Sequence, residues 1–170
     1  PETERGALKA ELDQLAAAMA EIKDHRLLPD VEIFYKAVRY ALDYDEFQNP
    51  AELDLAHQQL AIGLQRAAAL KSNTAPWIQQ TGLVVRGFRS AIDGSVQPYG
   101  LVVPDSYQSA SGRKHRLDFW FHGRGERTNE VAFIKERMTQ MGEFTPADTF
   151  VLHPYARYSN ANKFAGEIDC

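Results

Sequence analysis

The sequence predicts an α/β protein in which a helical N-terminal part precedes a small sheet. Apolar residues recur at three- and four-residue steps over residues 1–73, which is the period of amphipathic helices. From residue 77 onward, short β-branched and aromatic runs alternate with Gly and Pro, and one stretch orders strand, loop, helix and strand. That order is typical of a βαβ unit. We therefore predict a helical extension over 1–73 and a sheet-containing part over 77–170.

Three helices are predicted in the extension. The first carries an apolar stripe that we interpret as packing surface. A second helix should begin after Pro29, with Asp30 capping its free amides, and a third should follow Asn49-Pro50. Four aromatic residues between the last two helices predict either packing or a binding groove; they are Tyr35, Tyr40, Tyr44 and Phe47.

The second part predicts four strands and two helices, the second of them beginning near Ala165. Two β-rich runs flank Asp93-Gly94, a strong hairpin signal. The continuous apolar run Leu117–Phe121 is of the kind found in strands covered on both faces. A short helix is expected over 131–138, and a buried strand over 149–152 that ends at His153-Pro154.

Composition and charge exclude several classes of function. Of the 170 residues 44% are hydrophobic and 25% are charged, and the formal net charge is −4. An acidic chain has no electrostatic attraction for a polyanion, so we expect no nucleic-acid partner. No apolar run approaches the roughly 18 residues of a membrane span. The start at Pro1 leaves the compartment open, including export after removal of a signal.

Neither a disulfide nor a metal or other cofactor is expected from the ligand residues. Cys170 is the only cysteine of the sequence, so no intramolecular disulfide can form. The five histidines show no pairing at helical or strand spacing, and a His-Glu-x-x-His motif is absent; they are His25, His57, His115, His122 and His153.

A glycine-rich turn, His122-Gly123-Arg124-Gly125, follows the third predicted strand. Glycine has no Cβ, so the backbone can approach a ligand closely and direct N–H groups toward a developing negative charge. An ordinary strand-to-loop turn is the alternative, because four residues make a weak motif.

The surrounding sequence makes the turn more specific. Asp93-Gly94-Ser95-Val96-Gln97-Pro98-Tyr99-Gly100-Leu101-Val102-Val103-Pro104, a short loop, and then Leu117-Asp118-Phe119-Trp120-Phe121 before the turn resemble the opening of prolyl-oligopeptidase-like and feruloyl-esterase-like α/β-hydrolases. The resemblance covers about residues 81–170. It implies the first strands of a hydrolase sheet, a truncated three-layer αβα fold, and hydrolysis of a small-molecule ester or peptide through an acyl-enzyme.

Roles for individual residues follow from this resemblance. His122, Gly123, Arg124 and Gly125 would form the oxyanion loop, with Arg124 as the backbone N–H donor and His122 orienting the loop rather than moving protons. No Gly-x-Ser-x-Gly motif occurs, so the nucleophile, and the acid and base that follow it in chain order, are expected to be missing. The chain alone should be inactive.

Further substrate-binding candidates lie beside the turn and beyond the fourth strand. Arg127 could recognise a carboxylate or belong to a solvated loop. The others could face the substrate or form an ordinary surface loop; they are His153, Tyr155, Arg157 and Asn160. Two rival functions stay open, a helical partner-binding adaptor and a complete short binding module, and the oligomeric state is left open too.

Overall fold

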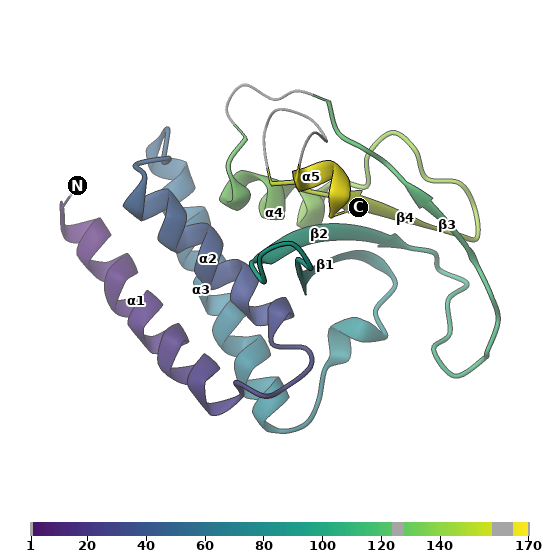
Figure 1. The fold of residues 1–170 in the computed structure, drawn as a ribbon, viewed down its shortest axis with the longest axis horizontal. Coiled ribbons are helices and arrows are strands. Elements are labelled where there is room, and N and C mark those ends of the chain that lie inside the picture. The colour runs from purple at the N-terminus through teal and green to yellow at the C-terminus, as the bar shows by residue number, and fades with distance from the viewer. Residues whose placement is uncertain (1, 124–127, 158–164, 170) are drawn as a thin grey trace.

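The computed structural model describes residues 2–123, 128–157 and 165–169 (Figure 1). The helices are α1 Glu2–Glu21, α2 Pro29–Asp43, α3 Pro50–Lys71, α4 Glu130–Thr139 and α5 Ala165–Ile168, with a short 3-10 turn at Pro76–Ile78. The strands are β1 Gly82–Arg89, β2 Val96–Val103, β3 Arg116–Phe119 and β4 Thr149–Pro154. None of the helices in these ranges combines the length and apolar character that crossing a membrane requires.

The four strands form one mixed sheet in the order β1-β2-β4-β3. β1 and β2 make the expected antiparallel hairpin, and Gly94 adopts a φ of 71° in the turn between them. β4 pairs antiparallel with β2 and parallel with β3. The crossover from β3 through α4 to β4 is therefore a βαβ unit, and the predicted α/β class is confirmed.

The helices α2 and α4 pack against β1 and β2, and α1 and α3 form a further helical layer behind α2 (Figure 1). Two glycines of the sheet permit this close packing. A Cβ at Gly87 would lie 2.1 Å from the carbonyl oxygen of Pro29, and a Cβ at Gly100 would lie 2.7 Å from the side chain of Arg137. Gly100 of β2 pairs with Val85, which lies two residues before Gly87 in β1. Residues two apart in a strand face the same side of the sheet, so α2 and α4 cover the same face of the sheet.

The prediction that Asp30 caps α2 is wrong. Leu28 occupies the cap position, without a capping side-chain bond. The Asp30 carboxylate is 1% exposed and accepts hydrogen bonds from Trp77 Nε1 at 2.8 Å, Gly87 N at 2.9 Å and Arg86 Nε at 3.1 Å. The side chain turns toward the sheet because β1 passes directly beside the start of α2.

The helical part and the sheet share one continuous apolar core. Leu8, Phe34 and Leu60 from the helices belong to the same buried cluster as Val85 of β1 and Ile134 of α4. Burial of this surface is the main stabilising contribution. The predicted limits 1–73 and 77–170 thus separate two sequence patterns, but both parts contribute side chains to the same core.

The expectation that the run Leu117–Phe121 is covered on both faces is also wrong. β3 lies at the edge of the sheet and ends at Phe119. Leu117, Phe119 and Phe121 are 50%, 43% and 50% exposed. A continuous apolar run predicts a strand, but its place in the sheet depends on which strands pair with it.

The aromatic residues between α2 and α3 mainly pack. Tyr35 and Phe47 are partly buried against the core. Tyr40 and Tyr44 meet edge to face, with ring centroids 5.6 Å apart, and Lys36 and Arg39 lie over the Tyr40 ring. These contacts support the packing interpretation of this cluster rather than a groove.

Candidate functional site

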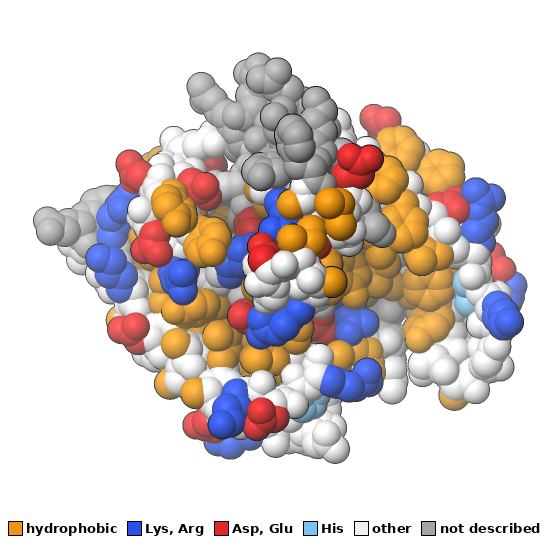
Figure 2. Space-filling view, in the orientation of Figure 1, with side chains coloured by type: hydrophobic (Ala, Val, Ile, Leu, Met, Phe, Trp, Pro, Cys, Tyr) orange, Lys and Arg blue, Asp and Glu red, His pale blue; other side chains and the backbone are white. Residues whose placement is uncertain are grey.

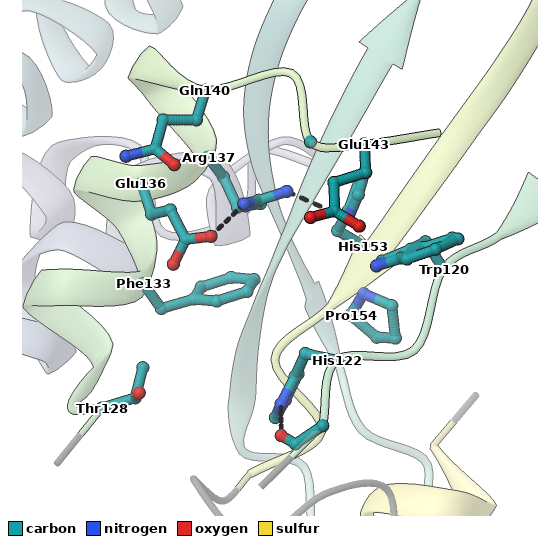
Figure 3. Close-up of a pocket in the computed structure, with 12 residues that line it drawn as sticks. Trp120, His122, Thr128, Phe133, Glu136, Arg137, Gln140, Glu143, His153 and Pro154 are labelled. Atoms are coloured by element: carbon teal, nitrogen blue, oxygen red, sulfur yellow. Dashed lines mark hydrogen bonds and ion pairs between the residues drawn. The ribbon is translucent and has the colours of Figure 1, made fainter. Parts of the chain in front are cut away.

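A cavity of about 450 Å³ lies beside α4, near the carboxyl ends of β3 and β4. Figure 3 shows Phe133, Glu136 and Arg137 reaching into it from α4, opposite Trp120 and His122 on the chain that leaves β3. His153 of β4 lies between these two sides. Because β3 and β4 are parallel, their carboxyl ends meet at one edge of the sheet. The cavity therefore brings together His122, Gly123 and His153, which sequence analysis named separately.

His122 links the glycine-rich turn to the end of β4. Its Nδ1 lies 2.7 Å from the carbonyl oxygen of Gly123, and its Nε2 lies 2.9 Å from the carbonyl oxygen of Tyr155. Both partners are acceptors, so a neutral ring donates to one of them at a time. The ring therefore lies between the carbonyl oxygens of Gly123 and Tyr155, which fits the orienting role expected of His122.

Tyr155 belongs to the framework of the site. The residue is 6% exposed, and its hydroxyl donates to the carbonyl oxygen of Thr128 at 3.2 Å. Its ring packs on Phe133 with centroids 5.0 Å apart. Burial raises the pKa of the Tyr155 hydroxyl, and the carboxyl groups of Glu130 and Glu46 add to the rise. Tyr155 therefore stays protonated and ties the start of α4 to the end of β4.

His153 and Arg137 form a buried pair on the floor of the cavity. His153 is 5% exposed, and its Nδ1 accepts a hydrogen bond from Arg137 Nη1 at 3.0 Å. Arg137 also pairs with Glu136, and its stem crosses the sheet over Gly100. Burial, with a contribution from Arg137, lowers the pKa of His153 to about 4. The imidazole is neutral near pH 7.

This buried histidine predicts a pH-dependent stability. As the pH falls from 6.5 toward 4, His153 takes up a proton in the unfolded chain before it does so in the folded chain. Protonation therefore stabilises the unfolded chain, and the free energy of unfolding decreases over this range. Relative to a His153→Gln variant, the free energy of unfolding should fall by roughly 2 to 3 kcal/mol between about pH 7.5 and 4.5. Urea denaturation of both chains measures the difference, and a pH-independent difference would contradict this assignment.

The start of α4 is anchored to the helical part. Asn129 caps α4, with its Oδ1 accepting from Ala132 N at 2.8 Å, and its Nδ2 donates to the carbonyl oxygen of Glu46 at 3.1 Å. Lys36 of α2 donates to Glu130 at 2.5 Å. Burial raises the pKa of the Glu130 carboxyl and Lys36 opposes the rise. The helix that follows the glycine-rich turn thus has a fixed position.

Arg157 serves another part of the molecule. Its guanidinium donates to Asp93 and Asp169 at 2.7 and 2.5 Å and to Ser90 Oγ at 2.6 Å. These bonds raise the pKa of Arg157, and they lower the pKa of Asp93. The residue joins the β1–β2 turn to the chain after α5 and does not line the cavity. Arg124, Gly125, Arg127 and Asn160 lie outside the described residues.

Arg137 is not among the site residues predicted from the sequence, although it lies in the predicted helix 131–138. Its position three residues after the buried Ile134 puts it on the inward face of α4. Charged side chains are seldom buried without a partner, so this position was a signal that Arg137 has a specific role. Across residues 2–123, 128–157 and 165–169, no group of three or more His, Cys, Asp or Glu side chains is arranged to hold a metal ion. Comparison with protein-family models, curated proteins and solved structures returns no match for this chain.

Proposed function

We propose that this chain supplies the oxyanion loop of a serine hydrolase of the α/β-hydrolase type, acting on a small-molecule ester or peptide. The observation that carries the proposal is the position of the glycine-rich turn. It follows β3, precedes α4 and lies at the carboxyl edge of the parallel pair β3 and β4. A loop between the third strand and the following helix is where such hydrolases provide an oxyanion-hole N–H.

The chemistry assigned to the turn is electrostatic. In acyl transfer the substrate carbonyl oxygen becomes negatively charged, and a preorganised N–H lowers the energy of that state. Arg124 would donate its backbone N–H, and Gly123 and Gly125 leave room for the oxygen. His122 lies between the carbonyl oxygens of Gly123 and Tyr155 and can donate to either of them, so it would orient the start of the turn. No Gly-x-Ser-x-Gly motif occurs in this sequence, so the proposal assigns the nucleophile, acid and base to groups that this chain does not supply.

His153 is not proposed as the general base. A base must reach the proton that it removes, but His153 Nε2 is buried and without a hydrogen-bond partner among the described residues. Its Nδ1 is occupied by Arg137. The pair forms instead a buried part of the wall of the cavity that Gly123 also lines.

A partner-binding module is the second candidate function, and the exposed apolar side chains favour a particular surface for it. They gather over β3 and the chain after it (Figure 2). Trp120 is 39% exposed, beside the half-exposed Leu117, Phe119 and Phe121. Extended apolar surface of this kind marks contact sites. In the described part of the helical extension, Tyr44, the residue that follows α2, is the large apolar side chain with comparable exposure, so a partner would be expected on the sheet rather than on the helical extension.

The proposed function is tested by covalent labelling of activated serines. The native protein that contains this sequence is treated with a fluorophosphonate probe, and its intact mass is compared with that of the 170-residue chain treated in parallel. We expect labelling of the native protein and none of the 170-residue chain, because an activated serine needs an adjacent base. A folded native protein that resists the probe would favour the partner-binding alternative.

A further inference from the structure

A second cavity, of about 600 Å³, lies between α3 and the start of β1. Its wall is largely apolar and includes Ile62, Ala69, Leu83 and Met138. Arg66 of α3 also lines it. A concave, mainly apolar site with a single charged group is the usual form of a small-molecule site.

The Arg66 guanidinium has donors to spare. Its central carbon lies 5.0 Å from the ring centroid of Phe34 and 4.9 Å from that of Trp77, and Nη1 donates to the carbonyl oxygen of Asp30 at 2.9 Å. A guanidinium carries five N–H donors. In the described part of the chain, no carboxylate lies within ion-pair distance of Arg66.

The local charges leave an excess of one positive charge. The Asp30 carboxylate is bonded by Arg86, Trp77 and Gly87, so it is already occupied. Arg66 and Arg86 thus lie near a single carboxylate, and only Arg86 forms an ion pair with it. Burial lowers the pKa of Arg66 to about 10, Asp30 opposes this and Arg86 adds to it. Arg66 remains charged near pH 7, yet its charge is incompletely compensated.

We propose that this cavity binds a small apolar carboxylate, whose charged group pairs with Arg66 and whose apolar body contacts the cavity wall. A guanidinium matches a carboxylate with two parallel hydrogen bonds. The single excess charge suits a monoanion better than a phosphate dianion, and the wall offers apolar contact for a ring or alkyl chain. This site is independent of the proposed oxyanion loop.

Benzoate and its neutral counterpart benzamide test the proposal by calorimetric titration of the chain. We expect saturable benzoate binding and at least tenfold weaker benzamide binding, because only the carboxylate compensates Arg66. Absence of benzoate binding at millimolar concentration, or equal affinity for the two compounds, would overturn the proposal.

Two matched variants locate the binding. Ala69 lines the cavity three residues after Arg66, where an Ala69→Glu side chain can pair with the guanidinium. Benzoate affinity should be at least tenfold lower in Ala69→Glu than in Ala69→Gln, because the two side chains have nearly the same size and only the carboxylate competes for the guanidinium, with unchanged circular dichroism in both. Arg66→Met should abolish binding if it folds. Benzoate affinity that is equal in Ala69→Glu and Ala69→Gln would place the ligand elsewhere and contradict the proposal.

Discussion

Replacing Asp30 with alanine is expected to destabilise the fold by about 3–5 kcal/mol, the range for removing one partner of a buried ion pair. Asp30 accepts from the Trp77 indole, the Arg86 guanidinium and the Gly87 amide. Its removal leaves two buried donors and one charge without an acceptor. Since these donors lie on β1 and on the segment before it, the change should loosen the contact between α2 and the sheet.

Urea denaturation measures this effect, with Glu32→Ala as the matched control. Glu32 lies on the same helix and pairs with Arg89, whose side chain is 47% exposed. Pairs of that kind contribute at most about 1 kcal/mol. Circular dichroism and tryptophan fluorescence should report a single transition, because the helices and the sheet share one core. Equal losses in the two variants would show that Asp30 is not a main link between them.

Local patterns predicted most of the elements. The three- and four-residue apolar steps located α1, α2 and α3, and Asp93-Gly94 located the hairpin turn. The parallel pairing of β3 and β4 followed from the order of strand, helix and strand. Each of these predictions depends on residues close together in the sequence, where propensity and periodicity act directly.

Predictions failed where distant segments decide the outcome. Asp30 is of a residue type that often caps helices, yet the close approach of Gly87 to Pro29 gives its carboxylate other partners on and beside the sheet. Leu117 and Phe119 have the pattern of a central strand, but the sheet order places them at its edge. Neither fact can be read from neighbouring residues.

The candidate site could be predicted in part for the same reason. His122, Gly123 and His153 were found because strand ends are marked in the sequence and parallel strands align those ends. Arg157 has the same type of side chain as Arg137, and only the fold distinguishes them. Arg157 pairs with Asp93, far away in the sequence, whereas Arg137 reaches the cavity across Gly100.

Replacing Arg124 with proline in the native protein should lower kcat for an aryl ester by about 100- to 1000-fold, the effect of removing one oxyanion-hole donor. Proline has no backbone N–H, so the substitution removes the group that the proposed function assigns to this position. KM should change little, since the missing bond forms mainly in the transition state.

The Arg124→Ala variant is the matched control, and the comparison of the two variants is the most direct test of the oxyanion-loop assignment. Alanine removes the guanidinium and keeps the N–H, so its kcat should stay within about tenfold of the original protein, while that of Arg124→Pro falls far below. Both variants should melt within a few degrees of the original. If Arg124→Pro retains the kcat of Arg124→Ala, the backbone N–H of residue 124 does not stabilise the oxyanion, and the central claim is contradicted.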